Sequence, residues 1–270
     1  MNCQMELRRK THTRTKPSTL LFVHIPKTAG TTFQSVLSQM YDDYDHCTVY
    51  PAWQQAKDVI KSITWNGRLR AVAGHFPYGL HLEAEIQPFI ESDVRYATFL
   101  RDPVRRVVSH YNHVMNSDHP SHREILGRHP TLESFLEHPW ARDVQTLFVS
   151  GWKPEDVARA PGRAANASIE ILRDRFEVVG LTERFDESLA LFAEAFGWRL
   201  PEYTSMNLAS ERIRRLRVEE LAPSLIDRIK AANRCDVAIY EYASSLFDER
   251  CSETRSSHYR DRPARGRRRE

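Results

Sequence analysis

Short apolar stretches alternate along this chain with segments whose apolar residues recur at helical spacing. The short stretches have the length and near-continuous apolar character of buried strands; they are residues 19–24, 70–74, 95–100 and 176–181. The helical segments place their apolar side chains on one face; they are residues 31–40, 53–62, 103–116 and 186–196. Alternation of this kind predicts an α/β fold in which a parallel sheet is flanked by helices.

The remaining segments add helices to this frame. Residues 117–175 hold helical signals and polar loops, and residues 221–247 again have helical spacing. The helix at 186–196 is expected to begin with Asp186 as its N-cap and to stop at Gly197. No repeat or Gly/Ser-rich linker divides the chain, so we expect a single domain over residues 19–251, with 117–175 as a helical insertion.

Charge is distributed unevenly over the 270 residues. The net charge is +3, but residues 1–18 and 252–270 each carry +4, so the part between them carries −5. Both ends are expected to be disordered, solvated tails, and a specific nucleic-acid partner is not expected. No apolar run of about 18 residues predicts a transmembrane helix, and the N-terminus lacks the apolar core of a signal peptide.

A loop of small and polar residues joins the first strand to the first helix. It contains Lys27, Thr28, Ala29, Gly30, Thr31 and Thr32. Backbone N–H groups and the positive end of a helix dipole meet at such a loop, which suits a phosphate or sulfate group. The loop is not a Walker A motif, because Lys27 precedes the only glycine. Taken alone, it is equally compatible with an ordinary strand-to-helix turn.

A second strand end carries a similar arrangement. Arg101 follows the strand at 95–100, Asp102 is a good N-cap, and Pro103 is a good first helical residue. Ser109 lies about two turns into the helix and off its apolar stripe. The Arg101 guanidinium and this hydroxyl are suited to hold an anion. The alternative is that Arg101 pairs with Asp102 or a neighbour.

Together the two stretches, PKTAGTTF and RDPVRRVVSHY, resemble the sulfotransferases that use 3′-phosphoadenosine 5′-phosphosulfate (PAPS). The likeness is greatest to Golgi carbohydrate O-sulfotransferases of the heparan-sulfate 2-O type and their bacterial relatives, and it covers about residues 19–247. Weaker similarities are seen at 143–151, where the family usually opens with Asn and this chain has Asp143, at 178–185, and at Asn233, Asp236, Tyr240 and Tyr242.

The resemblance implies a P-loop-like sulfotransferase fold and assigns roles to residues. The 26–32 loop, with Lys27, would bind the 5′-phosphosulfate, and Arg101 with Ser109 would bind the 3′-phosphate. A late polar loop would reach the 3′-phosphate and adenine through Asn207, Ser210 and Arg212, unless residues 203–215 are a plain helix entry. The acceptor would be a carbohydrate or another hydroxyl compound, contacted by the 117–175 insertion.

Sulfuryl transfer requires a base for the acceptor hydroxyl, and histidine is suited to that task. His75 directly follows the strand at 70–74 and matches the Gly-His pair that holds the catalytic histidine of the family. A structural histidine that caps the strand is the alternative. His81, Glu83 and Glu85 are fallback bases, whereas His24 inside the first strand is expected to be a hydrogen-bonded core residue.

Two functions of other classes remain open at this stage. One is a nucleotide kinase or related P-loop protein, and the other is a non-catalytic protein that binds nucleotide or glycan. No C-x-x-C pair or Cys/His cluster predicts a metal site, and the pairs His110/His113 and His119/His122 lack an evident carboxylate partner. Since Golgi relatives carry a membrane anchor and this chain starts with Met and shows none, we expect a cytoplasmic protein.

Overall fold

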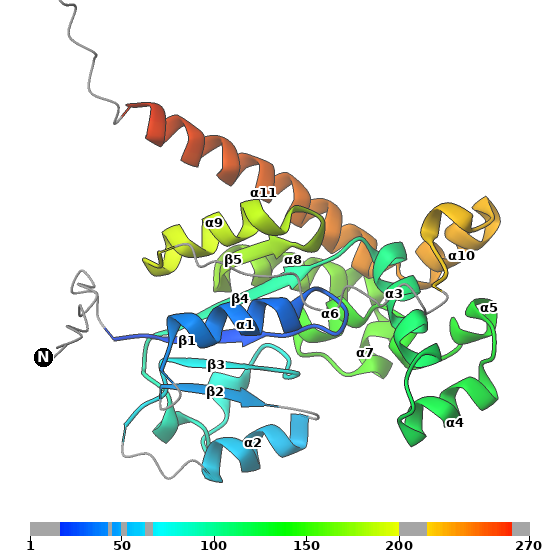
Figure 1. Ribbon diagram of the computed structural model, residues 1–270, viewed down its shortest axis with the longest axis horizontal. Coiled ribbons are helices and arrows are strands. Elements are labelled where there is room, and N and C mark those ends of the chain that lie inside the picture. The colour runs from blue at the N-terminus through cyan, green and yellow to red at the C-terminus, as the bar shows by residue number, and fades with distance from the viewer. Residues whose placement is uncertain (1–16, 43–44, 50–52, 63–66, 200–214, 261–270) are drawn as a thin grey trace, which may run out of the picture.

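Five parallel strands form the centre of the protein in a computed structural model that describes residues 17–42, 45–49, 53–62, 67–199 and 215–260 (Figure 1). The strands are β1 (Thr19–Val23), β2 (His46–Val49), β3 (Ala71–Gly74), β4 (Val94–Leu100) and β5 (Phe176–Leu181). Their order in the sheet is β2-β3-β1-β4-β5. The carboxyl ends therefore share one edge, on the right in Figure 1, and the predicted α/β class is confirmed.

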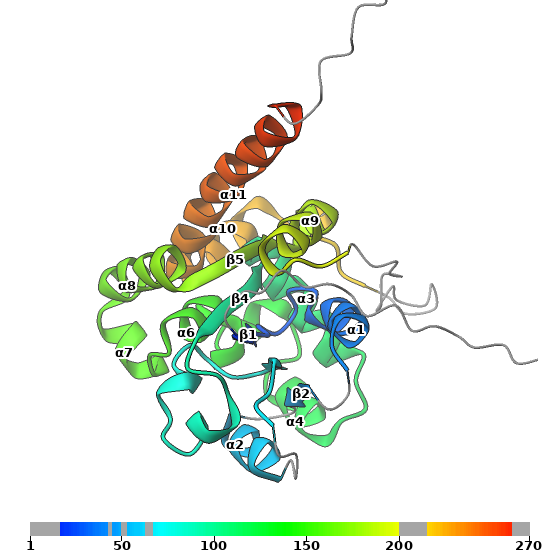
Figure 2. The same ribbon diagram turned by 90° about the vertical axis from the view of Figure 1, so that its left-hand side faces the viewer.

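Helices cover both faces of this sheet, which is why its inner strands β1, β3 and β4 are largely apolar on both sides. One face is covered by α1 (Gly30–Met40) and α9 (Phe185–Phe196), and the other by α6 (Val144–Ser150), α8 (Pro161–Arg175) and α11 (Arg234–Arg260) (Figure 2). Under α1 and α9 the rings of Phe22 and Phe192 each lie 4.4 Å from the ring of Phe33. This aromatic packing fixes α1, and with it the 26–32 loop, on the sheet.

A second, smaller core stands beside the carboxyl edge. It joins α3 (Pro103–Met115), α4 (Pro120–Arg128), α5 (Leu132–Phe135) and α10 (Pro223–Ala232), the helical group at the right of Figure 1. Two short helical elements, η3 (Pro139–Ala141) and α7 (Pro154–Arg159), complete residues 117–175. That segment is helical as predicted. Its first part, with α4 and α5, belongs to the smaller core, whereas Val144, Val149 and Leu172 of its later part pack into the sheet core.

Several boundaries differ from the sequence prediction. Strand β2 was not predicted from the sequence. It has only four residues, and every second one, His46 and Thr48, is polar. The helix expected over 221–247 is two helices that meet at Asn233. Asp186 is not an N-cap, since α9 already begins at Phe185, after the turn η4 (Thr182–Arg184). Gly197 does end α9, with a φ of 67° that favours glycine.

The end of the chain also departs from expectation. Helix α11 continues to Arg260, past the predicted start of a disordered tail at residue 252. Residues 252–260 contain neither Gly nor Pro, so nothing in the backbone interrupts the helix there. Among the described residues, no helix combines the length and apolar character needed to span a membrane.

Candidate active site at the carboxyl edge of the sheet

The 26–32 loop brings two backbone positions into the left-handed region just before α1. Lys27 has a φ of 72° and Ala29 a φ of 67°, an uncommon conformation for residues with a Cβ. Ala29 is also the N-cap of α1 and has no side chain able to cap it. No side chain of Ala29 therefore covers the first N–H groups of α1, and strained backbone of this kind concentrates at binding sites.

Gly30 allows a histidine ring to lie directly against the loop. A Cβ at position 30 would stand only 2.0 Å from Nε2 of His24, so no other residue fits without moving that ring. His24 is buried, as predicted for a core residue, and its pKa lies well below its usual range because of burial and the nearby charges of His75 and Lys27. A neutral His24 therefore separates the loop from His75.

Lys27 is partly buried in a cationic environment. Burial, together with the charges of Arg101 and Arg215, lowers the pKa of its ammonium group to about 8. A cation held at this cost is stabilised when an anion arrives. The predicted hydroxyl donors are less uniform. Thr28 donates its hydroxyl to the Ile25 carbonyl oxygen at 2.9 Å and is buried, Thr32 is buried, and Thr31 is exposed at the start of α1.

Arg101 reaches from the end of β4 to the 26–32 loop. Its Nη1 donates to the carbonyl oxygen of Lys27 at 3.0 Å, so the two predicted cations are physically linked. The alternative pairing with Asp102 is not observed, because that carboxylate caps α3 by accepting the Arg105 N–H at 2.9 Å. Nε of Arg101 is instead 3.9 Å from the Glu183 carboxylate, a loose contact. Half-buried Ser109 lies two turns along α3.

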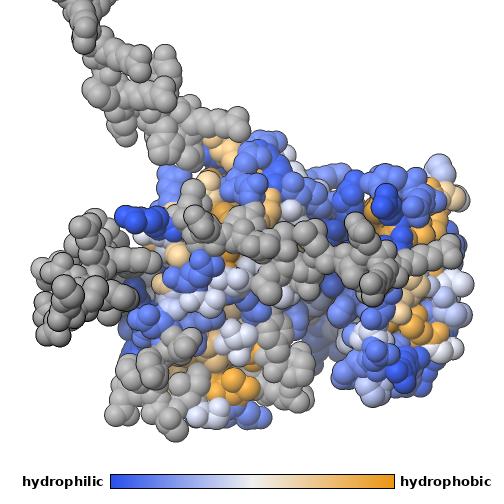
Figure 3. Space-filling model, viewed as in Figure 1, coloured by the Kyte–Doolittle hydropathy of each residue, from blue (hydrophilic) through white to orange (hydrophobic). Residues whose placement is uncertain are grey.

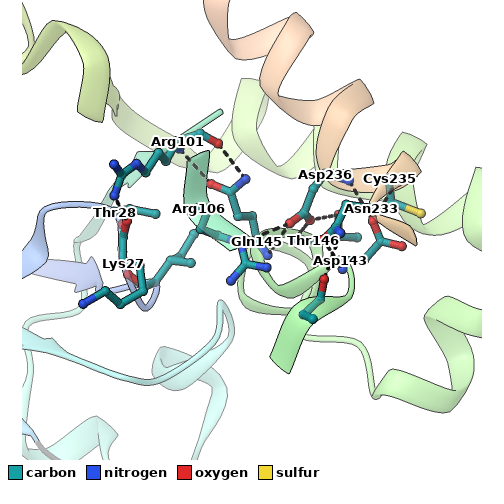
Figure 4. A network of polar contacts seen from close by, with 12 residues as sticks. Lys27, Thr28, Arg101, Arg106, Asp143, Gln145, Thr146, Asn233, Cys235 and Asp236 are labelled. Atoms are coloured by element: carbon teal, nitrogen blue, oxygen red, sulfur yellow. Dashed lines mark hydrogen bonds and ion pairs between the residues drawn. The ribbon is translucent and has the colours of Figure 1, made fainter. Parts of the chain in front are cut away.

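Gln145 holds the backbone of Arg101 from the neighbouring helix α6 (Figure 4). Its Oε1 accepts the Arg101 N–H at 2.8 Å, and its Nε2 donates to the Arg101 carbonyl oxygen at 2.9 Å. The Gln145 side chain is fully buried. The Gln145 amide thus bonds both the N–H and the carbonyl group of Arg101. This fixes the backbone from which the Arg101 side chain projects.

Two helix N-termini cap each other behind this contact. Asp236 on α11 accepts the N–H groups of Gln145 and Thr146 at the start of α6, at 3.1 and 2.7 Å. Asp143 at the start of α6 accepts those of Cys235 and Asp236 at the start of α11, at 2.9 and 3.0 Å. Each carboxylate therefore satisfies orphan donors of the other helix. Asp143 thus has an acceptor role at the position where the sequence departs from the pattern it resembles.

Arg106 provides the positive charge that this carboxylate pair needs. Its side chain and that of Asp236 are both fully buried, with Nε 3.8 Å from the carboxylate. Burial raises the pKa of Asp236, whereas the charge of Arg106 opposes that rise. The polar network shown in Figure 4 thus connects α11, α6, Arg101 and Lys27 without leaving a buried carboxylate unpaired.

A pair of variants should separate positioning from stability. Gln145→Ala removes both bonds to the Arg101 backbone, so we expect roughly 1–3 kcal/mol lower stability and about 5–10-fold weaker binding of a nucleotide 3′-phosphate. Thr146→Val removes only a hydroxyl that donates to Asp236 at 2.8 Å. It should lose comparable stability but retain affinity. Thermal unfolding and calorimetry measure both; equal affinity losses would contradict the positioning role.

His75 lies at the predicted strand end, next to the loop. Its Nδ1 is 2.7 Å from the carbonyl oxygen of His24, and a carbonyl only accepts, so Nδ1 carries the proton. The lone pair of the neutral ring therefore belongs to Nε2, the tautomer that a general base requires. Burial lowers the pKa of His75, and the bond to His24 partly offsets this. The ring lies against that of His24, tilted by 30° with centroids 4.5 Å apart.

The fallback bases lie elsewhere. His81 has its Nδ1 2.9 Å from the hydroxyl of Tyr96, which also accepts the N–H groups of Gly79 and His81, so that hydroxyl donates to the ring. This bond leaves the proton of His81 on Nε2. Glu85 forms an ion pair with Lys61 at the end of α2 (Trp53–Ser62), and Glu83 lies two residues before it. Shortly after Glu83 and Glu85 the chain reaches the amino edge of the sheet, where Ile90 forms a β-bridge with Leu69, just before β3.

Three predicted donor-site residues, Asn207, Ser210 and Arg212, lie outside the described residues. Within the described part of the chain, no group of three or more His, Cys, Asp or Glu side chains is placed to hold a metal ion. Gln145 and Asp236 were noted in the sequence only as parts of weak family similarities. Nothing in their own residue types indicated a role, since each acts through backbone groups that are remote in sequence.

Comparison with known proteins decides the family. The family model described as galactose-3-O-sulfotransferase matches residues 2–269. The chain belongs to the galactose-3-O-sulfotransferase family. The predicted resemblance to carbohydrate sulfotransferases is thereby confirmed, and the type matched is the galactose-3-O type. The motifs around Lys27 and Arg101 thus stand in a member of this family.

Curated relatives are distant but match most of the chain. Human galactose-3-O-sulfotransferase 2 is 22% identical over 244 residues, which are 83% of this chain and 58% of the relative. Bovine galactose-3-O-sulfotransferase 3 is 24% identical over 250 residues, 87% and 58% of the two chains. Mouse galactosylceramide sulfotransferase is 24% identical over 248 residues, 84% and 56%. The chain therefore spans somewhat more than half the length of these relatives.

One similar solved structure is a sulfotransferase from Alicyclobacillus acidocaldarius. It has 17% sequence identity and a TM-score of 0.43, and the match covers 87% of this chain and 97% of that one.

Proposed function

We propose that this protein transfers a sulfuryl group from PAPS to a hydroxyl group of a galactose-containing carbohydrate or glycoconjugate. The observation that carries the proposal is the link between Lys27 and Arg101 at the N-terminus of α1, with the base-competent Nε2 of His75 close by. Family membership supports the reaction class, and the names of the curated relatives support a galactosyl acceptor.

The residues present fit a donor that carries two anionic groups. The N–H groups that Ala29 leaves uncapped, together with the Lys27 ammonium, are suited to the 5′-phosphosulfate. Arg101 has an Nε without a hydrogen-bond partner among the described residues, and half-buried Ser109 lies two turns along α3, so we assign both to the 3′-phosphate. Lys27 offsets charge on the oxygen that leaves sulfur.

The acceptor reacts by in-line displacement. Its hydroxyl oxygen forms a bond to sulfur while the bond from sulfur to the phosphate oxygen breaks, as in the closely related phosphoryl transfer. His75 Nε2 takes the hydroxyl proton, and the carbonyl of His24 holds the ring through Nδ1 and stabilises the imidazolium that results. No metal is part of this proposal.

Donor selectivity provides the first test. The chain should bind PAPS and adenosine 3′,5′-bisphosphate more tightly than AMP or ATP, because each charge-assisted bond to a 3′-phosphate contributes about 1.5–3 kcal/mol. Arg101→Ala should remove most of this preference for the bisphosphate over AMP. Calorimetry measures it, and equal affinity of the wild-type protein for AMP and the bisphosphate would refute the donor assignment.

An assay with labelled PAPS tests the reaction itself, with simple β-galactosides and galactosylceramide as acceptors. Transfer to these compounds is the expected result, and sulfation of non-sugar alcohols alone would contradict the acceptor class. No observation favours the kinase-like alternative, since the loop lacks the Walker A order. None favours the non-catalytic alternative, since the chain has Lys27, Arg101 and His75 together.

A further inference from the structure

Trp140 is one of two large hydrophobic side chains that are exposed in the described part of the chain; 44% of it is accessible. It lies in η3, inside the segment where acceptor contacts were expected. The His110 ring stacks on it almost in parallel, at 13° and 5.5 Å between centroids. His138 and His122 meet it edge-on, at 5.4 and 6.3 Å. The accessible surface of the indole is therefore on the side away from His110.

Imidazole rings surround this indole. Nδ1 of His110 and Nδ1 of His122 have no hydrogen-bond partner among the described residues, and both atoms are buried. His113 is exposed on the next turn of α3, and its ring lies 5.1 Å from that of His122. An exposed aromatic face bordered by imidazole donors and acceptors is suited to a ligand with one apolar face and polar edges.

The backbone of Trp140 is connected to the polar network behind Arg101. The guanidinium of Arg106, which pairs with Asp236 in the network of Figure 4, contacts the Trp140 carbonyl oxygen at 3.4 and 3.5 Å. Burial lowers the pKa of His110, His113 and His122, and the charge of Lys27 adds to this lowering. Figure 3 shows the surface hollowed between the part that carries α2 and the part that carries α4 and α5.

We propose that the accessible face of Trp140, with His113 and His122 at its edge, is the subsite on which the acceptor galactosyl ring stacks. This inference rests on the proposed function and identifies where its acceptor binds. The axial C4 hydroxyl of galactose leaves an apolar patch of C–H groups on one side of the ring, which packs against indole. The hydroxyls at the ring edge then lie toward His122 and the exposed imidazole of His113.

Direct binding tests this subsite independently of turnover. Methyl β-galactoside and lactose are titrated into the full chain with adenosine 3′,5′-bisphosphate present, and binding is followed by ligand-observed NMR. We expect Trp140→Ala to weaken sugar binding about tenfold and Trp140→Phe to retain most of it, since a smaller ring still stacks. The affinity for the bisphosphate should be unchanged in both variants. Leu82→Ala, at the other exposed hydrophobic side chain, is the matched control and should bind sugar normally.

The outcomes separate the subsite from the reaction. Sugar binding that depends on Trp140 without sulfuryl transfer would support the subsite and refute the proposed function. Transfer to galactosides with sugar affinity unchanged within twofold in Trp140→Ala would refute the subsite alone. A wild-type chain that binds the bisphosphate but neither sugar would also overturn the subsite, as would an equal loss of bisphosphate affinity in Trp140→Ala.

Discussion

Lys27→Met should lower the rate of sulfuryl transfer by about 10²–10³, the loss found when a charge-stabilising group is removed from a transition state. Binding of the donor should weaken less, because the N–H groups at the start of α1 and the Arg101 side chain are still present. Methionine keeps the length of the side chain and removes only its charge. Steady-state kinetics and calorimetry on one preparation separate the two effects.

The pH dependence gives a second signature of Lys27. Burial and the charges of Arg101 and Arg215 lower its pKa to about 8, so the ammonium form is lost as pH rises through that value. The ratio kcat/KM for PAPS reports the free enzyme and should therefore fall above about pH 8. In Lys27→Arg this alkaline limb should disappear, because the guanidinium keeps its charge. The variant should reach only part of the wild-type rate, since a planar guanidinium replaces a compact ammonium group.

Lys153→Met is the matched control, because Lys153 is an exposed lysine at the start of α7. Its rate should stay within twofold of the wild type. If Lys27→Met also stayed within twofold, the assignment of Lys27 to the leaving oxygen would be wrong.

The second large effect is expected at His75. His75→Ala should lose about 10²–10⁴ in the rate of transfer, because no group remains to take the acceptor proton. Affinity for adenosine 3′,5′-bisphosphate should be nearly unchanged. The rate requires the neutral ring, so kcat/KM for the acceptor should fall as pH drops through a pKa below the usual 6.5, the direction in which burial shifts it. That acid limb should vanish in the variant.

His81→Ala separates catalysis from structure. His81 is bonded to Tyr96, away from the carboxyl edge, so this variant should lose some thermal stability while its pH profile and rate stay close to wild type. If His75 had only a structural role, His75→Ala would likewise lose thermal stability and keep the wild-type pH profile. Early melting, weaker donor binding and an unchanged pH profile in His75→Ala would therefore contradict its role as base.

The sequence by itself determined the α/β class and the motifs. Burial on both faces makes parallel strands such as 95–100 nearly continuous apolar runs, and helices such as α1 show their period directly, so both are local signals. The capping of α3 by Asp102 and the stop of α9 at Gly197 were predicted for the same reason. The positions of Lys27, Arg101 and His75 at strand ends followed from this order, whereas their roles and the localisation stay predictions.

Only the tertiary structure decided how these residues are held. Gln145 meets the backbone of Arg101 across 44 residues, and Asp236 caps α6 across about 90. Such contacts depend on where two elements meet in space, and no local pattern encodes that. The same holds for the His24 ring against Gly30, which forbids a Cβ there, and for Trp140, whose exposure depends on the packing of η3 against α3. Sequence periodicity reports what one element buries, whereas the site is built from contacts between elements.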